Sequence, residues 1–136
     1  MRLAELTRDF WELRSAEESA RKNPEKFHLP PLEAREGLKR GHAAKLIFEI
    51  ESEDEAGKPV LQGERMWVIV REQVGPAYIG ILDSKPASFE PSEKVYLCFG
   101  AEIPFLPEHV IDIASPPTDY VEWQLGQEPE RKWPRE

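Results

Sequence analysis

Residues 63–71 constrain the fold of this 136-residue chain more than any other segment. Apolar side chains recur there at every second position, which is the period of a β-strand with one buried face. Met66, Val68 and Val70 share that apolar face, whereas the opposite face mixes charged residues with Trp67. We therefore expect this segment to be the central strand of a sheet.

Similar alternation predicts the other strands of that sheet. A charged turn over residues 52–58 separates the central strand from the one before it, so we expect these two to pair as a hairpin. Gly80 lies inside a short apolar run and indicates a bulge or a close approach between backbones. The expected strands span residues 43–52, 60–71, 78–82, 94–99 and 109–113.

Two helices are expected before the first strand. The first is predicted over residues 3–21 and ends before Pro24, because four apolar residues recur there at spacings of three and four. These residues are Leu3, Leu6, Phe10 and Leu13. The second helix is predicted over residues 32–40, with Gly41 just past its end in the position that favours a left-handed residue.

These elements predict an α+β fold: a small, strongly bent antiparallel sheet of about five strands, barrel-like, with two N-terminal helices. A chain of this length suits one domain, which we place at residues 1–117. Residues 118–136 have no clean hydrophobic period, so we expect a wrapped or partly disordered tail in which Trp123 is the anchor.

Charge and composition narrow the possible partners. With 18 basic and 26 acidic residues, the formal charge is -8, which disfavours nucleic acid because binding to phosphates depends on Lys and Arg. An acidic surface favours a basic protein partner, or simply keeps the chain soluble. No apolar run approaches the roughly 20 residues of a membrane span, and the first residues do not resemble a signal peptide, so we expect a cytoplasmic protein.

Several short motifs together carry a family resemblance. The chain resembles the DUF2314 family of small bacterial proteins over about residues 33–113, most clearly in the Gly-Glu-x-Met-Trp-Val pattern of residues 63–68. Asp83-Ser84 and the turn at residues 92–94 depart from the family pattern. The resemblance implies a compact α+β domain with a strongly bent sheet, and kinship with immunity-type proteins of bacterial toxin systems; it implies no established chemistry.

Glu64, Arg65 and Trp67 form the first candidate binding site. A carboxylate, a guanidinium and an indole within four residues suit a peptide or a small charged ligand, and tryptophan often anchors protein interfaces. The structural alternative is that Trp67 packs under a helix while Glu64 and Arg65 form a cross-strand charge pair.

His109, Asp83 and Asp112 form the one polar cluster that suits acid-base chemistry, provided that the closing strand lies beside the end of the third. The three histidines lack the spacing of a metal motif, and no cofactor is predicted. Cys98 has apolar neighbours on both sides, which is typical of a buried structural thiol rather than a nucleophile.

The acidic hairpin tip is the last candidate, and Glu53 and Asp54 are its central residues. The leading hypothesis is a non-enzymatic binding protein, of immunity or inhibitor type, that offers this tip or the Trp67 face to a protein partner. One rival is a small-ligand sensor or enzyme in which His109, Asp83 and Glu64 converge on a pocket. Another is a structural subunit whose C-terminal tail orders on a second chain.

Overall fold

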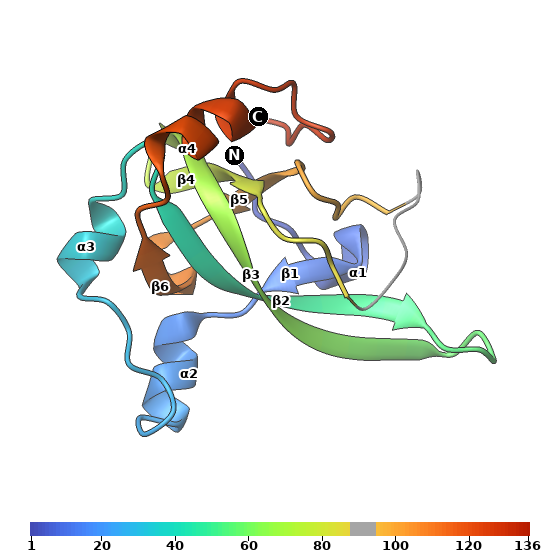
Figure 1. Cartoon of the computed structure of the whole chain (residues 1–136). Helices are drawn as coiled ribbons and strands as arrows, with labels where there is room; N and C mark the ends of the chain where they lie inside the picture. The colour runs from blue at the N-terminus through green and yellow to red at the C-terminus, as the bar shows by residue number, and fades with distance from the viewer. Residues whose placement is uncertain (88–94) are drawn as a thin grey trace.

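A curled antiparallel sheet with helices around it makes up the computed structural model of the chain, which describes residues 1–87 and 95–136 (Figure 1). The helices are α1 (Leu6–Asp9), α2 (Ala16–Lys22), α3 (Leu32–Glu36), a 3₁₀ turn (Pro107–His109) and α4 (Thr118–Leu125). The strands are β1 (Trp11–Leu13), β2 (Ala43–Glu53), β3 (Pro59–Val74), β4 (Ala77–Leu82), β5 (Glu102–Phe105) and β6 (Val110–Ala114). The predicted α+β class with a bent antiparallel sheet is confirmed.

The strand order is β1-β2-β3-β4-β5, and β6 also pairs with β2. β1 lies against residues 48–50 of β2, whereas β6 lies against residues 43–46 of the same edge. The six described strands therefore occupy five positions across the sheet. β2 and β3 are much longer than their neighbours, so their far ends project from the body as a hairpin arm (Figure 1).

The predicted hairpin of β2 and β3 is confirmed, with Leu46 opposite Met66 in its register. Its turn is held by Asp54, whose Oδ1 accepts the backbone N–H groups of Ala56 and Lys58, both at 2.9 Å. This arrangement is an Asx turn, which explains why an aspartate begins the charged loop. Gly57 follows with a φ of 80°, where a side chain would be strained.

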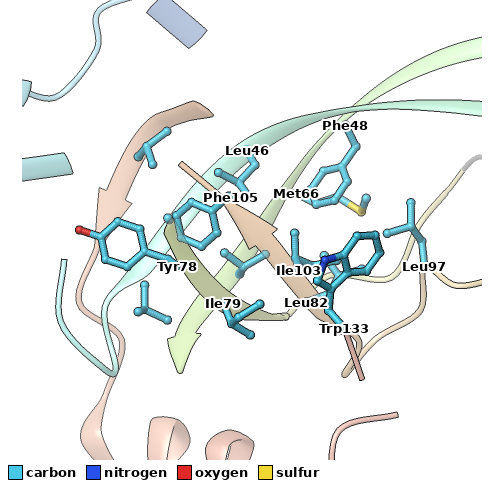
Figure 2. Packing of buried hydrophobic residues seen from close by; sticks show 14 of the residues in the cluster. Leu46, Phe48, Met66, Tyr78, Ile79, Leu82, Leu97, Ile103, Phe105 and Trp133 are labelled. Atoms are coloured by element: carbon cyan, nitrogen blue, oxygen red, sulfur yellow. The ribbon is translucent and has the colours of Figure 1, made fainter. Parts of the chain in front are cut away.

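The main core lies on the concave face of the sheet (Figure 2). The predicted buried face of β3 is confirmed, because Met66, Val68 and Val70 are all in this core. Gly80 on β4 lies so close to β3 that a Cβ atom there would be 2.7 Å from Cγ2 of Val68. Glycine is therefore needed at this position for the sheet to curl tightly.

The opposite face of the sheet has a smaller apolar cluster under α4. Ile69 of β3 and Ile81 of β4 pack against Leu125, with Val121 at the margin. The helix thus covers one part of the convex face. Trp67, two residues before Ile69, lies on the same face and is half-buried.

The single helix predicted over residues 3–21 is wrong. Phe10 adopts a left-handed φ of 65°, which ends α1, and Trp11–Leu13 then pairs with β2 as a strand. A new helix starts after Ser15, whose Oγ accepts the N–H of Glu18 at 3.2 Å. Hydrogen bonding to β2 and this N-cap outweigh the helical spacing of the apolar residues.

Two further predictions need correction. The second helix ends at Glu36 rather than at residue 40, since Gly37 is its C-cap. Residues 95–99 form no strand, and residue 94 lies outside the described part of the chain. The strand in that region is β5 instead, where Pro104 sits opposite Ile79. Proline is tolerated because β5 is an edge strand.

The C-terminal residues wrap back onto the core. Trp133 is only 4% exposed, and its indole N–H donates to the carbonyl of Arg2 at 2.9 Å. Glu102, which is also buried, accepts the backbone N–H of Trp133 at 2.7 Å and two bonds from the Arg135 guanidinium. The anchor is therefore Trp133, and the expected anchor Trp123 is 53% exposed. No helix among the described residues is long and apolar enough to cross a bilayer.

Candidate functional site

A groove of about 570 Å³ lies where the concave face opens towards the hairpin arm, beside β1. Trp11, Ile50 and Leu97 are buried along it, and Phe10 is exposed at its mouth. We call this feature the aromatic groove. It has the size and the mainly apolar lining of binding pockets in proteins.

Trp11 and Tyr96 line the floor of the aromatic groove and belong to a cluster of rings that continues into the core. The Trp11 ring lies 5.8 Å from Phe48, 6.0 Å from Tyr96 and 5.8 Å from Trp133, measured between centroids. Tyr96 and Trp133 also meet edge to face at 5.4 Å. Such contacts fix the orientation of each ring, so the floor is preformed.

Phe10 is the unusual residue of this groove. Its side chain is 61% exposed, and its backbone is in the left-handed region, where a residue with a Cβ is disfavoured by about 1 kcal/mol. Its backbone N–H donates to Leu6, and its carbonyl accepts from Glu51. The fold thus holds a large apolar ring in water on a strained backbone, a combination that points to a binding role.

Three acidic residues border the groove. Asp9 is neutralised by Arg2, which donates to both of its carboxylate oxygens at 2.7 and 2.8 Å. These bonds hold the pKa of Asp9 below its usual value. Glu51 and Glu53 also border the groove, and neither forms an ion pair within residues 1–87 and 95–136. Their side chains alternate with those of Ile50 and Ser52, so they point to the convex side of β2. The groove itself is therefore mainly apolar, and these carboxylates lie on the other side of the arm.

The polar groups of the floor differ in their hydrogen bonding. The Tyr96 hydroxyl donates to the carbonyl of Glu102 at 2.7 Å, and burial raises the pKa of Tyr96. The Trp11 indole N–H, by contrast, is buried and has no acceptor among the described residues. An unsatisfied buried donor costs about 1–3 kcal/mol, and Trp11 is the residue at the centre of the ring cluster.

Three of the predicted binding residues lie in one row across the convex face. Asp112 on β6 is opposite Lys45 on β2, and Lys45 is opposite Trp67 on β3. Asp83 follows the end of β4, and its N–H donates to the carbonyl of Trp67 at 2.9 Å. Lys45 Nζ lies 5.6 Å from the Trp67 ring centroid, a cation-π contact that sequence reasoning missed.

Asp83 is bound by α4 rather than left free for chemistry. Its Oδ1 accepts the Tyr120 hydroxyl at 2.6 Å and the Gln124 side-chain amide at 2.8 Å. Asp83 and Asp112 are three strand positions apart, roughly 14 Å. Two carboxylates at this separation do not share a proton.

Glu64 and Arg65 fall on opposite faces of β3. Glu64 is opposite Phe48 and so faces the concave side, where its Oε2 accepts the N–H of Ala87 at 3.0 Å. Arg65 is exposed on the convex side, with its guanidinium carbon 5.1 Å from the Phe27 ring centroid. Neighbouring residues of a strand cannot act on one side of it.

His109 lies apart from both faces just described. Its side chain is buried, and Nδ1 accepts the backbone N–H of Leu106 at 3.0 Å. Burial lowers the pKa of His109, so the neutral ring is favoured. The convergence of His109, Asp83 and Glu64 on one pocket does not occur, because Glu64 and Asp83 are on opposite faces of the sheet.

The two predicted acids of the hairpin have different positions. Glu53 lines the aromatic groove, whereas Asp54 holds the hairpin turn. Cys98 is half-buried, and burial raises the pKa of its thiol, which disfavours the nucleophilic thiolate. Among the described residues, no group of three or more His, Cys, Asp or Glu side chains could hold a metal ion.

Comparison with family models, with curated proteins and with solved structures gives no match. The resemblance to the DUF2314 family therefore stays a prediction. Sequence reasoning missed the aromatic groove because Phe10 and Trp11 were assigned to a helix. Phe10 ends α1 and Trp11 begins β1, a break that the helical spacing of the apolar residues does not show.

Proposed function

We propose that this chain is a protein-binding module that holds an extended, apolar and basic segment of a partner protein in the aromatic groove. The observation that carries the proposal is Phe10, an exposed aromatic ring on a left-handed backbone beside a preformed aromatic floor. Aromatic anchors next to buried apolar surface are typical of binding hot spots.

Charge supports a basic partner. Glu51 and Glu53 have no ion-pair partner in the described part of the chain, and the formal charge of the whole chain is -8. Lys or Arg residues of the partner that reach around the edge of β2 would approach these carboxylates on the other side of the arm and increase the association rate. The proposal therefore keeps the acidic hairpin arm as part of the binding surface.

Selection from a library of random heptapeptides displayed on phage tests this function. The full chain should enrich peptides that combine an apolar residue with Lys or Arg. Ser52→Trp, which places a bulky ring in the groove, should enrich none of them. Failure of the wild-type chain to enrich any sequence, or enrichment of the same peptides by Ser52→Trp, would contradict the proposal.

A further inference from the structure

One edge of the hairpin arm has no neighbouring strand among residues 1–87 and 95–136. β3 pairs with β2 along the whole arm, but it pairs with β4 only from Val68 onward. Residues 59–65 of β3 thus have β2 on one side and no described strand on the other. Leu61, in the middle of this segment, is 54% exposed.

The backbone groups of this edge can be assigned from Trp67. Its N–H donates to Ser84 Oγ at 3.1 Å, and its carbonyl accepts from Asp83 at 2.9 Å, both on the side away from β2. In a strand the N–H and C=O groups of alternate residues point to the same edge. The groups of Arg65, Gly63 and Leu61 therefore point outward as well.

Exposed edges of this kind are usually protected by lysine, proline or a bulge. Lys58 and Pro59 protect only the start of this edge, residues 60–65 contain neither lysine nor proline, and the β3 bulge lies further along, between Val70 and Glu72. On the side away from β2, no backbone hydrogen bond among the described residues reaches Leu61, Gly63 or Arg65. This edge can accept a further strand.

We propose that the occupant is a second copy of this chain, paired antiparallel along β3 about a two-fold axis at Gly63. This register is self-complementary. It places Leu61 opposite Arg65 of the second copy, and Gln62 opposite Glu64, so that no like charges face each other. The two central glycines have no side chains, which permits close approach.

Repulsion between two acidic chains does not prevent this pairing. Glu51 and Glu53 lie on β2, one strand further from the axis. With strands spaced by about 4.8 Å, the β2 strands of the two copies are roughly 14 Å apart. This exceeds the screening length of about 8 Å at physiological ionic strength. The aromatic groove lies on the other edge of β2, so the pairing leaves it open.

Sedimentation velocity over a concentration series of the full chain tests the proposal. We expect a monomer–dimer equilibrium with a dissociation constant of about 100 μM, because two short strands bury less area than a standard interface. Leu61→Glu should lower this constant and Leu61→Lys should raise it. The dissociation constants of the two variants should differ by about three- to ten-fold. Residue 61 of each copy faces Arg65 of the other, so both of these pairs are attractive with Glu and repulsive with Lys.

Net charge alone predicts the reverse order of the two dissociation constants, because Leu61→Glu makes the chain more acidic.

Gly63→Pro removes the central outward N–H and leaves the hydrogen bonds between β3 and β2 intact. This variant should be a folded monomer, and circular dichroism checks the fold. A chain that stays monomeric to about 1 mM, far above the expected constant, overturns the proposal. So do equal dissociation constants for the two Leu61 variants, or open-ended oligomers in place of a dimer.

Discussion

The Tyr120 hydroxyl donates a hydrogen bond of 2.6 Å to Asp83 Oδ1 and so ties α4 to the end of β4. This contact brings together two segments that are 37 residues apart in the sequence. Burial, together with the bond to Asp83, raises the pKa of Tyr120 to about 12. The link between the helix and the sheet therefore depends on the protonated phenol.

The Tyr120 contact predicts a loss of stability at alkaline pH. Because the folded pKa is above the unfolded value of 10.0, the contribution is complete below pH 10 and falls as pH rises towards 12. Urea unfolding of wild type and Tyr120→Phe at several pH values measures it. The two stabilities should converge between pH 10 and 12, and a constant difference over that range would refute the assignment.

The contacts of Glu102 predict a loss of stability at acid pH, the opposite of the pH dependence expected for Tyr120. Its burial favours the neutral acid, but hydrogen bonds from Arg135 and Trp133 outweigh this and lower its pKa below 4.5. A depressed folded pKa gives stability that is complete above the unfolded value and is lost as pH falls below it. Glu102→Gln should cost about 1.5–3 kcal/mol at pH 7.

Thermal unfolding at pH 7 and at pH 3, followed by tryptophan fluorescence, measures the effect of Glu102→Gln. The difference from wild type should shrink at the lower pH. Glu55→Gln at the exposed hairpin tip is the matched control and should change neither value. An unchanged difference at both pH values would show that the Glu102 charge does not hold the C-terminal residues.

The two buried tryptophans of the ring cluster predict unequal costs of substitution. Trp133→Phe removes a hydrogen bond to the carbonyl of Arg2, whereas Trp11→Phe removes an N–H that has no acceptor among the described residues. Both changes remove a similar ring volume. The stability lost in Trp133→Phe should therefore exceed the stability lost in Trp11→Phe by about 1–2 kcal/mol. Chemical denaturation of both variants measures this difference, and equal losses would contradict it.

The two strand glycines offer a test of the curled sheet. Gly80→Ala places a Cβ 2.7 Å from Cγ2 of Val68 in the core and should cost about 1–3 kcal/mol. Gly63→Ala meets only the flexible end of Arg14, at 3.3 Å, and should cost clearly less. The denaturation midpoints of the two variants, each compared with wild type, measure these costs. Similar costs would mean that the close approach of β3 and β4 is not required.

The alternating strands were predictable because their pattern reports directly on a sheet with one buried face. β2, β3 and β4 and the hairpin between the first two follow from this signal. The division of the N-terminal segment into α1, β1 and α2 was harder to predict from the sequence. Leu6, Phe10 and Leu13 have helical spacing, and only pairing with β2 makes Trp11–Leu13 a strand. The Ser-x-x-Glu pattern at Ser15 was the local sign of a second helix.

The missed strand β5 shows how position in the sheet decides the effect of a proline. The N–H of Glu102 donates to Arg131 on the outer side of β5, so the nitrogen of Pro104, two residues later, also faces outward. No hydrogen bond to β4 is lost there. The pattern of residues 102–105 could not indicate this, because edge and centre strands differ only in tertiary context.

The candidate site was predictable only in part. Glu53 lies at the aromatic groove as part of the acidic arm, but the groove itself depends on contacts between distant segments. Tyr96 and Trp133 reach Trp11 from positions more than 80 residues later in the chain. No local period reports such contacts, and Trp133 carries no sequence signal that distinguishes it from the exposed Trp123.

Phe10, at the mouth of the aromatic groove, and Trp123 on α4 provide a matched comparison, because both are exposed aromatic residues in different parts of the surface. Truncation of an exposed ring should leave the fold intact. Isothermal titration with the most strongly enriched library peptide measures the affinity of wild type, Phe10→Ala and Trp123→Ala. We predict that Phe10→Ala weakens binding by about ten-fold or more and that Trp123→Ala stays within about two-fold of wild type. Unchanged affinity of Phe10→Ala, or an equal loss in both variants, would contradict the account.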